Sequence, residues 1–265
     1  MSRLPTYFLS HGGGPWPWVN GMRDLFARSA QAFSAIPGTL PQRPKAVLMI
    51  TGHWEAPGFA VSTGEHPTMD YDYSGFPPHT YALQYPAPGH PDLAARVMSL
   101  MQAHGLSCVG DPTRGYDHGT FVPLHFMFPQ ADVPVVLLSL KQGYDVASHL
   151  KAGEALAPLR DEGVLIVGSG MSFHNMRGYG DPRFGPISDT FDAWLTATVE
   201  ADPATRAQGL AHWDQAPSAR LCHPPRAEEH LLPLMVVAGA ASEGRGQRVF
   251  SDRVLETTLS AYRFD

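Results

Sequence analysis

Short apolar runs alternate with amphipathic segments along the chain, and the two patterns predict different elements. Runs without polar alternation predict strands buried on both faces, and they lie at Thr6–Leu9, Ala46–Ile50, Val133–Leu140 and Gly163–Gly168. Segments with helical spacing of apolar residues are Met22–Ala35, Pro91–Ala103, Ala147–Arg160, Ile187–Glu200, Pro203–His212 and Pro224–Ala240. Strands alternating with helices indicate an α/β fold with a central, largely parallel or mixed sheet flanked by helices.

Two long segments interrupt this alternation. Thr68–Gly89 is rich in Pro, Tyr and Gly and predicts a shaped loop with a short strand near Tyr81–Gln84. Gly110–Gly119 predicts a second loop, and Arg248–Phe250 and Ser260–Phe264 predict strands near the C-terminus. Long loops of this kind are often functional lids. We therefore expect a single catalytic domain over residues 1–265.

Composition narrows the function. The chain of 265 residues is 43% hydrophobic, enough for a sizeable core, and its net charge is -6 without a basic run, which argues against nucleic-acid binding. Cys108 and Cys222 are too few for a disulfide framework and predict free thiols. Tyr7–Leu9 is too short for a signal-peptide core, and the longest apolar runs fall short of the ~18 residues of a membrane helix. We expect a cytoplasmic protein.

Histidines gather at the predicted strand ends. The chain has 13 histidines, and His11, His53 and His174 each follow a predicted strand beside glycines. His118 lies in the second loop, and His230 lies in the last predicted helix. Ligands of open α/β sheets bind beyond the carboxyl ends of the strands, and neutral imidazole binds zinc and iron well. The three together indicate a metal site there, although each histidine alone is better explained as an ordinary loop residue.

Aromatic residues accompany these histidines. Tyr73, Phe76 and Tyr81 lie in the first loop, and Tyr116 lies two residues before His118. We predict substrate contacts from Tyr73, Phe76 and Tyr116, because aromatic side chains often line small-molecule pockets. The alternative is a packed surface loop.

Six motifs occur in an order typical of one family. They are SHGGGP at 10–15, GHWE at 52–55, YSGFP at 73–77, DHG at 117–119, GSGMSFHN at 168–175 and EEHLLP at 228–233. Together they resemble the class III extradiol ring-cleavage dioxygenases, in particular the DOPA 4,5-dioxygenase-like branch. The resemblance runs from about His11 to Pro233, most of the chain.

The resemblance implies a non-haem iron(II) enzyme that opens a catechol-type ring with dioxygen. It implies metal ligands at His11, His53 and His230, with His174 either a further ligand or a residue facing the metal. It gives His118 the acid/base role, for which His174 is the second candidate. The implied partners are a small aromatic diol and dioxygen; a homo-oligomer is left open, as are the particular catechol and the ring bond.

One departure concerns the metal. Better-known members of the wider superfamily hold iron with two histidines and a glutamate, whereas this chain offers His230 beside Glu228 and Glu229. An all-histidine site suits zinc at least as well as iron, but zinc is redox-inert. We therefore expect iron(II) as the working metal and allow for zinc in purified protein.

Two other functions fit the same histidines. A zinc hydrolase would need a carboxylate base, for which Glu55 or Glu229 is available. A non-enzymatic binding protein on the same fold is the other alternative. Dependence on oxygen separates the dioxygenase from both. Gly168-Ser169-Gly170 lacks the spacing of a serine nucleophile elbow.

Overall fold

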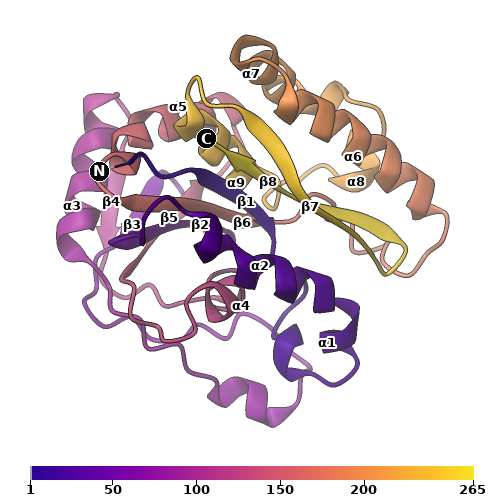
Figure 1. Ribbon diagram of the computed structural model, residues 1–265, viewed down its shortest axis with the longest axis horizontal. Helices are drawn as coiled ribbons and strands as arrows, with labels where there is room; N and C mark the ends of the chain where they lie inside the picture. Colours follow the sequence, from indigo (N-terminus) through magenta and orange to yellow (C-terminus); the bar gives the residue numbers. More distant parts are fainter. Residues whose placement is uncertain (1) are drawn as a thin grey trace.

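Eight strands form one mixed sheet in the computed structural model, which describes residues 2–265 (Figure 1). Their order across the sheet is β4-β3-β5-β2-β6-β1-β8-β7. The strands are β1 (Thr6–Ser10), β2 (Ala46–Ala56), β3 (Phe59–Ser62), β4 (Cys108–Asp111), β5 (Val135–Lys141), β6 (Val164–Gly170), β7 (Gly246–Val254) and β8 (Thr257–Phe264).

The middle of the sheet is parallel. Strands β5, β2, β6 and β1 are parallel neighbours, while β8 pairs antiparallel with β1 and with β7 at one edge. At the other edge β3 pairs antiparallel with β5 and parallel with β4. Because β1, β5 and β6 are buried almost throughout, they read as uninterrupted apolar runs in the sequence.

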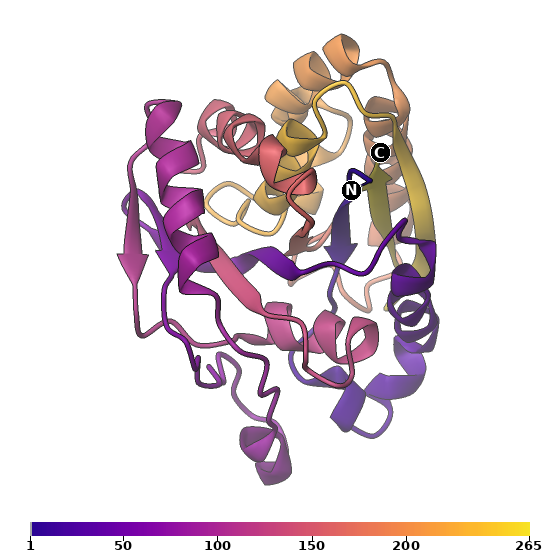
Figure 2. The same ribbon diagram turned by 60° about the vertical axis from the view of Figure 1, so that its left-hand side comes forward.

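Helices cover both faces of the sheet (Figures 1 and 2). One layer contains α3, α5 and α9, the other contains α2 and α4, and α6 packs against β7 and β8. The α-helices are α1 (Met22–Leu25), α2 (Ala27–Thr39), α3 (Pro91–Ala103), α4 (His118–Met127), α5 (Val146–Leu156), α6 (Phe184–Glu200), α7 (Pro203–Ala211), α8 (Ala219–Cys222) and α9 (Leu232–Ala241). The short 3-10 helices are η1 (Trp16–Trp18), η2 (Pro78–Ala82), η3 (Ala157–Arg160) and η4 (Trp213–Gln215).

Helix α9 packs against α5 and against the central strands β6 and β1, and all ten of its residues are buried. It lies against α5 at glycine contacts: a Cβ added to Gly153 would meet Val236 O at 2.0 Å, and one added to Gly239 would meet Leu150 O at 2.1 Å. Only glycine permits backbones to approach so closely. This contact presses α9 onto the sheet and fixes the segment that enters it.

The predicted fold class is confirmed, and most elements lie where the pattern placed them. The strand β2 is longer than the apolar run Ala46–Ile50, because it continues to Ala56 past a register shift between Ile50 and Glu55. His53 therefore lies inside the far part of β2 rather than after it. Strands β3 and β4 were not predicted, because four residues carry too little periodicity.

Two predicted elements are wrong. Instead of a strand near Tyr81–Gln84, the loop forms the 3-10 helix η2, entered through Pro77 and Pro78. The last long helix does not begin at Pro224; it begins at Leu232. Proline fits only the first turn of a helix, so Pro233 marks the true start, and residues 224–231 form turns that present His230.

Two further expectations concern the whole chain. Both Cys108 and Cys222 are free thiols. Within residues 2–265, no helix has both the length and the apolar character that crossing a bilayer requires.

Candidate metal centre

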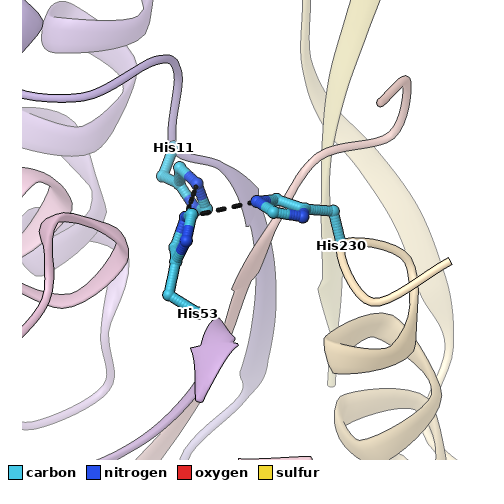
Figure 3. A group of neighbouring side chains, drawn as sticks. All are labelled: His11, His53 and His230. Carbon is cyan, nitrogen blue, oxygen red and sulfur yellow. Dashed lines mark hydrogen bonds between the residues drawn. The ribbon is translucent and has the colours of Figure 1, made fainter. Parts of the chain in front are cut away.

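Three histidines from distant parts of the chain converge at one point (Figure 3). His11 directly follows β1, His53 lies in β2, and His230 lies just before α9. The Nε2 atom of His53 is 3.0 Å from Nε2 of His11 and 3.2 Å from Nε2 of His230. The rings thus point their Nε2 atoms at a shared centre.

Backbone contacts place these rings. The His11 N–H donates to Gly170 O at 3.0 Å, and the Met171 N–H donates to His230 O at 2.9 Å. A Cβ on Gly170 would lie 2.0 Å from His230 O, and one on Gly52 would lie 3.2 Å from the His230 ring. The glycines of the GHWE and GSG motifs therefore create the room in which His230 reaches the strand ends.

The hydrogen bond of His11 fixes its tautomer. Its Nδ1 lies 2.9 Å from Ser169 Oγ, and that hydroxyl donates its single proton to Gly119 O. Ser169 Oγ can therefore only accept from His11. His11 carries its proton on Nδ1, which leaves a lone pair on Nε2.

Carboxylates fix the other two rings in the same way. Nδ1 of His230 donates to Glu229 Oε1 at 2.8 Å, and Nδ1 of His53 lies 3.2 Å from Asp72 Oδ2. An ionised carboxylate only accepts, so Nδ1 of His230 bears the proton. The negative charge of Asp72 beside Nδ1 of His53 favours the same tautomer there. All three Nε2 atoms then present lone pairs to one another, and no proton remains to join them.

This arrangement fits a metal ion. Metal–nitrogen bonds of about 2.0–2.1 Å separate neighbouring ligand atoms by roughly 3.0–3.4 Å, and the separations of 3.0 and 3.2 Å match. The ligand atoms of His11, His53 and His230 all lie within 4.8 Å of one another. Outer partners on each Nδ1 are typical of metal-binding histidines. The residues therefore fit a three-histidine metal centre.

Burial keeps these imidazoles neutral. Desolvation, with the charge of neighbouring imidazoles, lowers the pKa of His11 and of His230 well below the usual value. For His53, burial and then His118 lower the pKa to about 3, against the opposing effect of Asp72. Since only neutral imidazole binds metal, the site stays competent at neutral pH.

His118 lies beside the three ligands and shares Asp72 with His53. It is the first residue of α4, whose N-cap is Asp117. Its ring centroid is 4.0 Å from that of His53 and 5.2 Å from that of His11. Its Nδ1 donates to Asp72 at 2.9 Å, which leaves its Nε2 as a free base.

His174 occupies the opposite flank. Its ring stacks on His230 with centroids 3.5 Å apart. Its Nδ1 lies 3.1 Å from Glu229 Oε1 but is not aligned for a hydrogen bond. It is absent from the mutually close group of His11, His53 and His230, so of the two roles left open by the sequence this geometry favours a residue beside the centre over a further ligand.

The aromatic residues divide into two groups. The Tyr73 ring is 6.0 Å from His118, so it lies beside the candidate centre, and Phe76 packs against Tyr73 with ring centroids 5.5 Å apart. Tyr116 does not, because it is fully buried in the core and its hydroxyl donates to Ala87 O at 3.1 Å. The predicted substrate contact of Tyr116 has no support in this geometry.

Sequence reasoning missed the outer partners Ser169 and Asp72. Ser169 was considered only as a nucleophile, and Asp72 was hidden among the tyrosines of the first loop. Asp72 is the carboxylate nearest in sequence to Tyr73, but its partners are 19 and 46 positions away, at His53 and His118. The signal for such residues is general: a metal-binding histidine needs an acceptor for the proton on its Nδ1.

The geometry is that of an α/β protein with a histidine cluster at the sheet that fits a metal ion. The family model described as the catalytic LigB subunit of aromatic ring-opening dioxygenase matches residues 5–262. The chain belongs to this family, that of the class III extradiol dioxygenases, and is an aromatic ring-opening dioxygenase family enzyme. The predicted resemblance is confirmed.

Individual relatives agree over most of their length. The chain is 40% identical to dioxygenase tasH of Hapsidospora irregularis, over 99% of this chain and 86% of that protein. It is 40% identical to a 4,5-DOPA dioxygenase extradiol of Beta vulgaris, over 90% of this chain and 87% of that protein. A crystal structure of an uncharacterized Escherichia coli K12 protein has a TM-score of 0.79 at 28% identity, covering 99% of this chain and 100% of that one.

Proposed function

We propose that the protein is an iron(II)-dependent extradiol dioxygenase that opens the ring of a catechol with dioxygen. The observation that carries this is the convergence of the Nε2 atoms of three histidines on one point, in a chain of the LigB family. Relatives named 4,5-DOPA dioxygenase extradiol support a DOPA-like diol. The family match over residues 5–262 supports one catalytic domain.

His11, His53 and His230 would hold the metal. When bound, the metal would lower the pKa of the catechol hydroxyls and would mediate electron transfer from the substrate to dioxygen. The three neutral imidazoles carry no charge to offset that of the ion, and the carboxylates Asp72 and Glu229 supply negative charge behind the His53 and His230 rings. Neutral nitrogen ligands suit iron(II) and zinc alike, and we assign iron(II) because ring opening by dioxygen needs a redox-active metal.

His118 is the better candidate for the acid/base residue. Its Nδ1 proton is held by Asp72 at 2.9 Å, so Nε2 is available to take a proton from a substrate hydroxyl. His174 lacks an aligned partner on Nδ1 and stacks flat on His230. We assign proton transfer to His118 and an orienting contact to His174.

The aromatic loop would form one wall of the substrate site. Phe76 packs on Gly14, where an added Cβ would lie 2.7 Å from its ring, and the Tyr73 hydroxyl donates to Thr80 O at 2.6 Å. Both contacts hold the rings in place beside His118. A flat aromatic diol suits such a wall.

The hydrolase alternative lacks a placed base. Glu55 is exposed and accepts a hydrogen bond from the Tyr144 hydroxyl at 3.0 Å. Glu229 is bonded to Nδ1 of His230, on the side of the ring away from the shared centre. Neither carboxylate is positioned against a metal-bound water.

The test is metal loading without air, followed by an oxygen-electrode assay against a panel of catechols. We expect oxygen uptake and a yellow product with iron(II), and no uptake with zinc. His230→Ala should abolish metal retention and activity, whereas His66→Ala, on an exposed loop, should retain both. Iron-loaded protein that leaves oxygen untouched across the panel contradicts the proposal.

A further inference from the structure

Asp72 lies between two imidazoles of different function. Its Oδ1 accepts the His118 backbone N–H at 3.0 Å, both of its oxygens are 2.9 Å from His118 Nδ1, and its Oδ2 is 3.2 Å from His53 Nδ1. The backbone of Asp72 is exposed, but its side chain is only 16% exposed. One carboxylate thus faces a metal ligand and the acid/base residue together.

A carboxylate can serve both rings at once because it only accepts hydrogen bonds. It accepts from Nδ1 of His118, and its charge favours a proton on the facing Nδ1 of His53, so both Nε2 atoms are left free for metal and substrate. An amide of the same shape could accept from only one ring. Its NH2 group would face the other ring and favour the opposite tautomer there.

The loop that carries Asp72 is fastened to the loop that carries His118. The Tyr116 N–H donates to Thr68 O and the Asp70 N–H donates to Tyr116 O, both at 2.8 Å. Arg114 forms ion pairs with Asp70, at 2.8 Å, and with Asp117. Asp72 lies two residues after Asp70, and His118 directly follows Asp117. The carboxylate and its imidazole are therefore held as one unit.

We propose that Asp72 is a positioning residue that sets the tautomer and orientation of both the metal ligand His53 and the acid/base residue His118. The inference rests on the proposed function for the naming of these two roles. Because the two rings share one acceptor, a change at Asp72 disturbs metal binding and proton transfer together. A carboxylate in contact with only one of the two rings would affect either metal binding or proton transfer, but not both.

The experiment does not depend on turnover: tautomers are read in the metal-free protein, because zinc on Nε2 would by itself place the proton of His53 on Nδ1, and affinity is read with zinc. Histidine side-chain 15N NMR reports the tautomer of each ring, and competition with a chelator reports zinc affinity. We expect Nδ1–H forms of His53 and His118 in the unaltered protein. Asp72→Asn should weaken zinc binding by about 10–100-fold and bring one of the two rings into the Nε2–H form.

Controls separate this role from general damage. Glu162→Gln removes a surface carboxylate paired with Arg96 and should leave zinc affinity and tautomers unchanged. Asp72→Glu keeps a double acceptor and should recover part of the lost affinity. If Asp72→Asn fails to fold, the tautomers of His53 and His118 in the unaltered protein still test the proposal.

The proposal is overturned by His118 in its Nε2–H form in the unaltered protein, or by unchanged zinc affinity in Asp72→Asn. These outcomes are independent of catalysis. A protein inactive on every catechol, yet showing the expected tautomers and the loss of affinity, would refute the dioxygenase proposal and leave the role of Asp72 standing.

Discussion

Ser169 shows how one hydroxyl can decide the chemistry of a ligand. It accepts from His11 Nδ1 at 2.9 Å and donates to Gly119 O, and it is fully buried. The second bond ties β6 to the start of α4, next to His118. A serine that matched no nucleophile motif thus orients a metal ligand and fastens the acid/base helix.

Ser169→Ala should therefore weaken metal binding by about 10–100-fold, because His11 loses the acceptor that keeps Nε2 free. It should also cost about 1–3 kcal/mol of stability, since two buried groups lose their partner. Ser139→Ala is the matched control: its Oγ accepts from Ala60 N–H at 2.8 Å in the same sheet. Equal metal affinity in the two variants, measured by chelator competition, would refute this role.

At the scale of elements, β6 and the entrance to α9 form a single unit. Gly168 and Gly170 face this segment, where added Cβ atoms would lie 2.5 Å from Pro233 O and 2.0 Å from His230 O. The buried helix α9 cannot move away from the sheet, because α5 packs against its other side at Gly153 and Gly239. The position of His230 is therefore set by close backbone packing rather than by its own loop.

Gly170→Ala should displace His230 and lower both metal affinity and stability. Overpacking typically costs about 1–3 kcal/mol, and a clash with backbone belongs at the upper end. In contrast, a Cβ on Gly38 in α2 meets nothing within 4 Å, so Gly38→Ala should be neutral or stabilise by about 0.5–1 kcal/mol. Thermal melts with and without zinc measure both effects; a Gly170→Ala protein that binds zinc normally would contradict the packing argument.

At the scale of the molecule, the fold keeps several histidines buried and neutral. His223 is fully buried, and its Nε2 donates to Ser172 O at 3.0 Å. Burial, against the opposing hydrogen bond to Ser172, lowers its pKa to about 3, and the pKa of His53 is also lowered to about 3. In the unfolded chain both would titrate near 6.5.

The metal-free protein should lose stability as the pH falls from about 6.5 towards 3. Between these pH values the unfolded chain binds protons that the folded chain does not bind, so the free energy of unfolding decreases with decreasing pH. Each such histidine contributes up to about 1.4 kcal/mol per pH unit. Urea titrations between pH 7.5 and 4.5 measure the slope, which His223→Phe should reduce; a slope unchanged in that variant would rule out His223 as a contributor.

Sequence patterns were sufficient to predict the regular elements at the middle of the sheet. The parallel strands β1, β5 and β6 were readable because burial on both faces leaves mostly apolar residues. The boundaries of β2 and α9 were not, because a register shift after Ile50 and the turn before Pro233 depend on what packs against them. At the site, glycine-flanked histidines were conspicuous, whereas Asp72 lay in a loop whose path no local pattern fixes.

The sequence by itself determined which chemistry was available: imidazoles at strand ends, six ordered motifs and thereby the family. Only the tertiary structure decided how that chemistry is arranged. In the folded protein His11, His53 and His230 converge, His174 lies beside them, and Tyr116 is buried in the core. The physical reason is that residue type fixes what a side chain can bind, while its neighbours in space fix its proton, its direction and its distance from the others.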